Sequence, residues 1–236
     1  MALDVYVGSL SRYYSGDWEN AAEKIARERG GRYQVVKPGD PKDKAKEADR
    51  IRPALVAWRR KLGASLGKRI ASPLSWDESA QAPYFTGRPG WDGFGSLVLW
   101  AAYAEHPALR RPQELAEEWD DDAALSRSNA EGFRSRYSHL VRNIELWLPS
   151  RFEITFEAED AGARKTVIGS SAMLRKQLAD LNSATWKADE EAVAGWQKRP
   201  PPDEAGLEGR ACFAFSILRD LADLAHANEL PMKLDY

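Results

Sequence analysis

Residues 75–95, SWDESAQAPYFTGRPGWDGFG, bring together the carboxylates and large rings that could do chemistry in this chain. The residues concerned are Trp76, Asp77, Glu78, Tyr84, Trp91 and Asp92. A glycoside-cleaving enzyme uses such groups, because sugar rings stack on indoles and cleavage needs two carboxyl groups. The same side chains could also anchor a basic protein partner. For the stretch itself we favour a third, structural interpretation, in which the rings bury an irregular path and Asp77 and Asp92 cap backbone N–H groups.

A second group of carboxylates is the run Asp120, Asp121 and Asp122. This run lacks the spaced oxygen ligands and the bidentate Glu of a calcium loop, so we interpret it as a solvated acidic turn. Exposed carboxylates can still meet a basic partner. The run therefore joins the six residues above as candidate partner-binding residues.

Motifs for metals, phosphates and nucleophiles are missing from the chain. The three histidines, His106, His139 and His226, form no H-x-x-x-H or H-x-H pair, and one cysteine cannot build a zinc site. The glycine-rich GWDGFGS lacks the lysine of a phosphate loop, and its Asp92 would repel a phosphate. Cys212 lies among aromatic residues, which favours a core thiol over a nucleophile. We expect no cofactor and no transition metal.

The composition is that of a globular protein without a strong overall charge. Of 236 residues, 43% are hydrophobic and 30% are charged, and the net charge is −2. Nucleic acid is therefore not an expected partner, because no global positive field would attract it. A single cysteine excludes an intramolecular disulfide and favours an intracellular protein, and no basic leader begins the chain. The longest apolar run, residues 97–104, is too short to span a membrane. We expect a cytoplasmic protein.

Charge is uneven along the chain. Residues 1–75 are rich in Lys and Arg, whereas residues 76–160 are rich in Asp and Glu. The two segments could pack against each other or solvate different faces. Alternatively, they could form a polarised surface that steers a charged protein partner.

The first half of the chain predicts strands and amphipathic helices. Residues 3–10 alternate as a half-buried strand does, and residues 17–31 form a helix with Asp17 as its N-cap. A second strand is expected over 32–37, followed by a polar segment or frayed helix up to Pro53. Leu55, Trp58, Leu62 and Leu66 then form one stripe of a helix. The next helix, over 93–107, is apolar nearly all round and is expected to begin at a cap made by Asp92.

The second half predicts a long helix, a hairpin and three more helices. We expect the clearest helix over 128–149, with Ser128 and Glu131 as a capping box. Its buried face would hold Phe133, Tyr137, Leu140, Val141, Ile144 and Trp147. A hairpin over 151–171 turns near 160–162, and a helix capped by Ser170 or Ser171 follows, with Met173, Leu174, Leu178 and Leu181 inward. Two further helices, over 189–197 and 211–230, precede an extended tail. The whole chain, 1–236, is predicted to be one helix-rich α+β domain with a small mixed or antiparallel sheet.

Three segments carry a resemblance to a known kind of protein. They are LDVYVGSLSRYYSGDWE at the start, SPLSWDES with APYFTGRPGWDGFGSLVLWAAYAEHP in the middle, and LPMKLDY at the end. With them the chain resembles a family of uncharacterised bacterial cytoplasmic proteins. It is also loosely similar to the immunity proteins of polymorphic-toxin and type VI secretion systems. These motifs carry no known chemistry, so no functional residue follows from the resemblance.

The resemblance implies a non-enzymatic protein-binding module, namely an immunity protein that neutralises a cognate toxin by occluding it. Such a partner would have a basic active cleft, as a nuclease must have to hold phosphates. The alternative is a small carboxylate-dependent hydrolase or transferase that uses the loop around Asp77 and Asp92.

Overall fold

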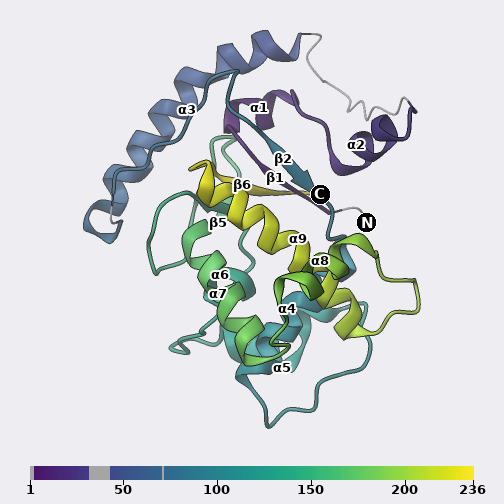
Figure 1. Ribbon diagram of the computed structural model, residues 1–236. Helices are drawn as coiled ribbons and strands as arrows, with labels where there is room; N and C mark the ends of the chain where they lie inside the picture. The colour runs from purple at the N-terminus through teal and green to yellow at the C-terminus, as the bar shows by residue number, and fades with distance from the viewer. Residues whose placement is uncertain (1–2, 32–42, 71) are drawn as a thin grey trace.

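A six-stranded mixed sheet forms the centre of the fold (Figure 1). The computed structural model describes residues 3–31, 43–70 and 72–236. The strands are β1 (Asp4–Val7), β2 (Phe85–Gly87), β3 (Leu146–Leu148), β4 (Phe156–Glu159), β5 (Lys165–Ser170) and β6 (Met232–Asp235). Their order is β2-β1-β6-β3-β5-β4, and the β3–β5 pair alone among them is parallel. The predicted α+β class with a small mixed sheet is confirmed.

Helices cover both faces of this sheet (Figure 1). One face packs against α4 (Trp91–Glu105), α7 (Ser171–Ala184) and α9 (Leu207–Ala227), and the other against α1 (Leu10–Ser15) and α3 (Lys44–Leu66). The smaller helices are α2 (Ala21–Glu28), η1 (Gly67–Arg69), η2 (Trp119–Asp121), α5 (Ala123–Asn129), α6 (Ser138–Val141) and α8 (Glu190–Lys198). Covering both faces buries all of β1, which the alternating sequence predicted to be half-buried.

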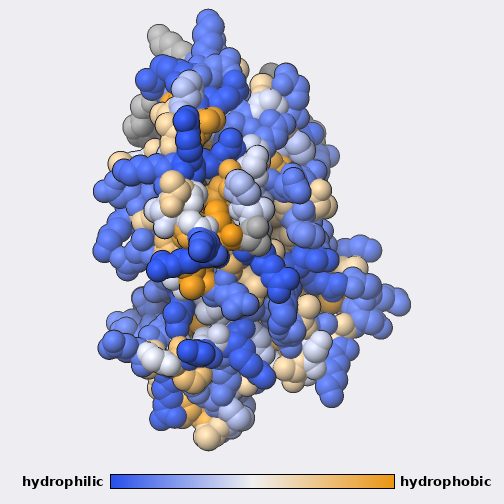
Figure 2. All heavy atoms as spheres, turned by 90° about the vertical axis from the view of Figure 1, so that its left-hand side faces the viewer, coloured by the Kyte–Doolittle hydropathy of each residue, from blue (hydrophilic) through white to orange (hydrophobic). Residues whose placement is uncertain are grey.

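The helix α3 follows its predicted apolar stripe, and the polar segment before Pro53 adopts the helical one of its two predicted alternatives. Leu55, Leu62 and Leu66 are buried against the sheet, and Trp58 is half-buried. Asp43 caps the helix by accepting a hydrogen bond from the Lys46 N–H, so the polar segment before Pro53 is also helical. Figure 2 faces the side of the molecule that carries α3, and this side is mostly hydrophilic. The helix therefore turns its charged residues outward.

The helix α4 is central, as its apolar sequence predicted, but its cap was predicted wrongly. Every residue from Gly93 to Tyr103 is buried. The N-cap is Gly90, with φ 71°, and no side chain caps this end, so Asp92 is not the cap. A side chain at Gly95 would lie 2.6 Å from the Trp119 ring, so glycine is needed for this indole to rest on the helix.

The prediction of one long helix over residues 128–149 is wrong. Within it, α6 is a single turn and residues 146–148 form β3. Gly132 and Asn143 have positive φ values, 79° and 50°, which no right-handed helix accepts. Ser128 is no capping residue, because its hydroxyl donates to the Glu105 carboxylate. The periodic apolar residues are nevertheless buried, except Phe133, which is half-buried, so burial was inferred correctly while the secondary structure was not.

Two other local predictions also need correction. Asn20, and not Asp17, caps α2, in a capping box with Glu23. The extended tail is the strand β6, which lies inside the sheet between β1 and β3. The strand predicted over 32–37 falls outside the described residues.

Several predicted elements are confirmed in the second half of the chain. The hairpin is β4–β5, although its first strand begins at Phe156 and not near residue 151. Ser170 caps α7 by accepting a hydrogen bond from the Met173 N–H, and Asp189 caps α8 in the same way. The last helix, α9, buries Leu218 and Leu221.

Lys233, on β6, forms a buried ion pair with Asp160, which lies in the β4–β5 turn. Nζ of Lys233 lies 3.3 Å from Oδ2 of Asp160, and the two side chains are 2% and 1% exposed. Asp160 also accepts hydrogen bonds from the N–H groups of Gly162 and Arg164 and from the Tyr14 hydroxyl. Burial opposes ionisation, but these donors together hold the pKa of Asp160 below its ordinary value.

We expect Asp160→Ala to lower the free energy of unfolding by about 3–5 kcal/mol, because it leaves the Lys233 ammonium buried without a partner. Chemical denaturation measures this change. The neighbouring Glu159→Ala serves as the control, since Glu159 is exposed, and it should change stability by about 0.5 kcal/mol or less. Equal stability of the two variants would contradict the assignment.

His139, in α6, is a buried neutral histidine. Its Nδ1 accepts a hydrogen bond from the Ser170 N–H at 2.9 Å, so the proton lies on Nε2, which faces the Glu153 carbonyl at 3.3 Å. The Trp147 indole donates to the His139 carbonyl. Burial lowers the pKa of His139 to about 4 from an ordinary 6.5.

This shift predicts acid sensitivity. Between about pH 6.5 and 4 the unfolded chain binds a proton at His139 and the folded chain does not, so stability should fall as the pH drops from 6.5 toward 4. The loss from this group is on the order of 3 kcal/mol. Denaturation of the wild type and His139→Gln at pH 7.5 and pH 5 should detect about 2 kcal/mol of this loss, because pH 5 lies 1.5 units below the ordinary pKa of 6.5. A wild type that loses no more stability than the variant would contradict the expectation.

Candidate functional site

The structure divides the nine predicted partner-binding residues between the two faces of the sheet. Trp76, Asp77, Glu78 and Tyr84 lie in the segment that packs against α1 and α3. The remaining five, Trp91, Asp92, Asp120, Asp121 and Asp122, lie near the start of α4 and the η2 turn. Contact between the Trp91 and Trp119 rings, 5.7 Å apart, joins α4 and η2.

Glu78 is part of the structural framework. It is 6% exposed, and its two carboxylate oxygens accept hydrogen bonds from the N–H groups of Leu10 and Ser11, at 3.2 and 2.8 Å. The Trp76 indole N–H donates to the same carboxylate at 2.5 Å. Glu78, from far along the chain, thus caps the first turn of α1. Ser9 is the N-cap residue of this helix, but its side chain makes no capping hydrogen bond.

Arginines from the basic first third hold the segment that contains Glu78. Arg12 donates to the carbonyls of Ala80 and Ala82, Arg52 donates to that of Glu78, and Arg59 donates to that of Trp76. The guanidinium of Arg59 also lies over the Trp76 ring, and that of Arg12 over the Tyr84 ring. The basic and middle thirds of the chain therefore pack together here, and Trp76 is buried.

Replacing the Glu78 cap should destabilise the fold. Glu78→Gln puts an amide NH₂ where an oxygen now accepts a backbone N–H, so we expect a loss of about 1–3 kcal/mol in unfolding free energy. Asp77→Asn is the matched control, because Asp77 is exposed and, among the described residues, its carboxylate binds only Ser79 of its own turn. Chemical denaturation of both variants measures the change in unfolding free energy. A Glu78→Gln variant as stable as the wild type would contradict the capping role.

The second group of candidates belongs to an acidic face. We use this name for the exposed carboxylates of Glu114, Glu117, Glu118, Asp120 and Asp121. None of the five forms an ion pair with a described residue. Trp119, which is 5% exposed, anchors this segment on α4.

The other members of the second group have partners within the protein. Asp122 caps α5 by accepting from the Ala124 N–H and also accepts from the Tyr103 hydroxyl. Asp92 pairs with Arg210 of α9 at 2.8 Å. Trp91 is half-buried and lies between Trp119 and the exposed Tyr236. These side chains shape the border of the acidic face.

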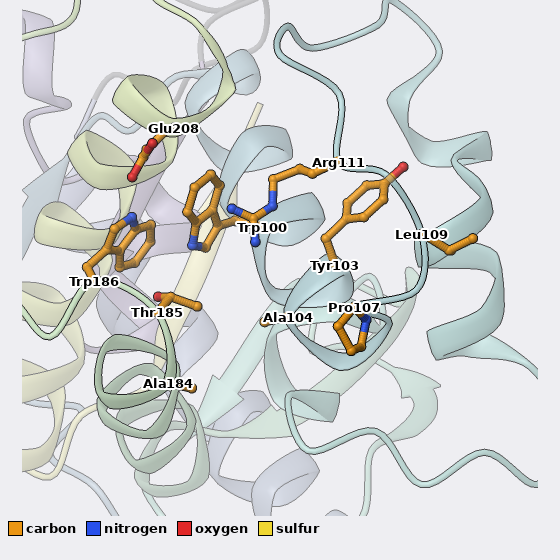
Figure 3. Close-up of a pocket in the computed structure, with 10 residues that line it drawn as sticks. All are labelled: Trp100, Tyr103, Ala104, Pro107, Leu109, Arg111, Ala184, Thr185, Trp186 and Glu208. Carbon is orange, nitrogen blue, oxygen red and sulfur yellow. The ribbon is translucent and has the colours of Figure 1, made fainter.

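A pocket of about 630 Å³ opens near the C-terminal end of α4 (Figure 3). We call it the indole pocket. Its lining residues are Trp100, Tyr103, Ala104, Pro107, Leu109, Arg111, Ala184, Thr185, Trp186 and Glu208. They come from α4, the segment after it, the end of α7 and the start of α9. No sequence pattern predicts this pocket, because its polar groups are spread over more than a hundred residues and its α4 part is typical of a core helix.

The Trp100 ring lies between a cation and a second indole. The Arg111 guanidinium carbon is 3.5 Å from the centroid of the Trp100 ring. The Trp186 ring stacks on Trp100 with 5.2 Å between centroids and 11° between planes. Burial lowers the pKa of Arg111, and the Glu208 carboxylate acts in the opposite direction. These contacts fix the pocket wall, since stacked rings and a cation over an indole resist rearrangement.

The acidic face begins beside the indole pocket. The Gln113 carbonyl accepts a hydrogen bond from the Leu207 N–H at 2.7 Å. Leu207 precedes Glu208 of the pocket, and Gln113 precedes Glu114 of the acidic face. Both features therefore border the same backbone contact.

The described residues present neither a reactive thiolate nor a cluster of metal ligands. Burial raises the pKa of the Cys212 thiol to about 12, so it is not a reactive thiolate at neutral pH. No group of three or more His, Cys, Asp or Glu residues in the described ranges is placed to hold a metal ion. No helix in the described parts of the chain is long and apolar enough to cross a membrane.

Comparison of the chain with protein-family models, with curated proteins and with solved structures finds no match.

Proposed function

We propose that this protein is a non-enzymatic protein-binding module that acts as an immunity protein, occluding a toxin whose active cleft is basic. The observation that carries the proposal is the acidic face. Its five exposed carboxylates lie within eight residues, Glu114–Asp121, and lack ion-pair partners among the described residues. The resemblance to immunity proteins points to the same class of function.

The carboxylates of the acidic face lack positively charged partners among the described residues. Exposed carboxylates elsewhere are commonly paired, as in Arg27–Glu19, Lys165–Glu157 and Arg175–Asp223. Unpaired neighbouring carboxylates repel one another, and a basic partner surface would relieve that repulsion. Complementary charge also speeds encounter, which suits an inhibitor that must reach a toxin before the toxin acts. A nuclease cleft has the required sign because it holds phosphates.

The border of the acidic face suits an anchored interface. Trp91 and Tyr236 are aromatic, partly or largely exposed and in contact with each other. Aromatic side chains of this kind carry much of the binding energy in protein interfaces, with charged residues around them. The buried Trp119 keeps the acidic segment fixed on α4, so little ordering is required on binding.

The alternative, a hydrolase or transferase built around Asp77 and Asp92, gains no geometric support. Asp77 belongs to the segment on the α1 and α3 face, whereas Asp92 pairs with Arg210 on the other face. Glu78, the third carboxylate of that loop, is occupied by backbone donors. We therefore do not propose this alternative further.

A charge-reversal experiment tests the proposal. The immobilised protein captures its partner from native cell extract, and the captured protein is identified and purified. We expect Glu117→Lys with Glu118→Lys to weaken binding by about tenfold or more at low salt, because the steering charge is inverted. Calorimetry at two salt concentrations measures the change. Glu28→Lys with Glu153→Lys is the control, since both residues are exposed and the net charge changes equally.

Growth provides the functional half of the test. Cells that express the captured protein should stop growing and should be rescued by the wild type and by the control variant, but not by the acidic-face variant. A captured protein that harms no cells, or equal rescue by all three forms, would overturn the proposal.

A further inference from the structure

The indole pocket contains hydrogen-bond donors that no described residue satisfies. They are the indole N–H groups of Trp100 and Trp186 and the Nε–H of Arg111. Each of these groups can only donate. Trp100 is 5% exposed, so its N–H is largely removed from solvent as well. Buried donors without acceptors cost free energy, which a ligand carrying acceptor oxygens would recover.

The pocket also contains two opposite charges that form no ion pair. Figure 3 shows Arg111 and Glu208 on opposite sides of the Trp100 ring. Neither residue pairs with any charged side chain in the described ranges. The other polar residues have partners, because the Tyr103 hydroxyl donates to Asp122 and the Thr185 hydroxyl donates to the Leu181 carbonyl. A guanidinium and a carboxylate thus remain available on either side of the indole.

From this arrangement we propose that the indole pocket binds a small zwitterion, an α-amino acid with an apolar side chain. The ligand's carboxylate accepts hydrogen bonds from Arg111 and an indole N–H, and its ammonium pairs with Glu208. Its side chain lies against Pro107, Leu109 and Ala184 of the lining. The volume of about 630 Å³ is within the range of small-molecule pockets. This inference is independent of the proposed toxin binding, which uses the acidic face.

Three related compounds test the charge requirement on the intact chain. L-phenylalanine carries both charges, 3-phenylpropionate lacks the ammonium, and phenethylamine lacks the carboxylate. We expect saturable binding of L-phenylalanine and binding about tenfold or more weaker for each analogue, because each lacks one charge-assisted hydrogen bond. Calorimetry gives the affinities, and nitrogen-labelled indoles should show shifted N–H signals for Trp100 and Trp186.

Variants of two pocket residues test whether L-phenylalanine binds in the indole pocket. Arg111→Gln and Glu208→Gln should each weaken L-phenylalanine binding about tenfold, as expected for loss of a charged partner. Arg110→Gln is the matched control, since Arg110 is the exposed neighbour and does not line the pocket. Glu117→Lys with Glu118→Lys should leave this binding unchanged, which separates it from the toxin proposal.

Several outcomes would overturn the inference. They are no saturable binding of L-phenylalanine at millimolar concentrations, equal binding of all three compounds, and unchanged binding by folded Arg111→Gln and Glu208→Gln. The compound series uses the wild type, so it decides the question even if a variant fails to fold.

Discussion

The arrangement of the fold depends on the buried ion pair between Lys233 and Asp160. The last strand, β6, lies between β1 and β3 and thereby joins the two halves of the sheet. Lys233 alternates with Met232 and Leu234, so its ammonium enters the interior on the α1 and α3 side. A buried ammonium requires a charged partner, and Asp160 meets this requirement while also binding Tyr14 of α1 and the β4–β5 turn. One carboxylate therefore holds three distant segments together.

Carboxylates in this protein serve two different purposes. Asp160, Glu78 and Asp122 are held by backbone N–H groups and by side-chain donors such as Tyr14, Trp76 and Tyr103. Their negative charge stabilises a turn or the first turn of a helix, because it accepts hydrogen bonds from the backbone N–H groups there. The carboxylates of the acidic face remain in solvent and keep their charge available at the surface. This difference in environment separates structural acidic residues from those that can recruit a partner.

The helix α4 is the common support for both candidate functions. Its first turn presents Trp91 beside Trp119 and the acidic segment, and its second half provides Trp100 and Tyr103 to the indole pocket. Because α4 is buried over most of its length against α9 and α5, neither site relies on a loop alone for its position. A rigid support of this kind reduces the entropy that a partner or ligand must overcome on binding.

The sequence by itself determined the elements whose signals are local. A serine cap before α7, the apolar stripe of α3 and the nearly continuous apolar surface of α4 follow from spacing and side-chain chemistry, and the structure contains each of them. Tertiary structure alone decided the features that depend on distant partners. Leu146–Leu148 became a strand because β5 and β6 were available to pair with it, although its apolar spacing equally suited a helix. Glu78 became a cap because α1 reaches it across 67 residues, and Trp100, Arg111 and Glu208 meet only after folding. Periodicity reports which side chains are buried, but the partner that buries them also fixes the backbone and the role of each polar group.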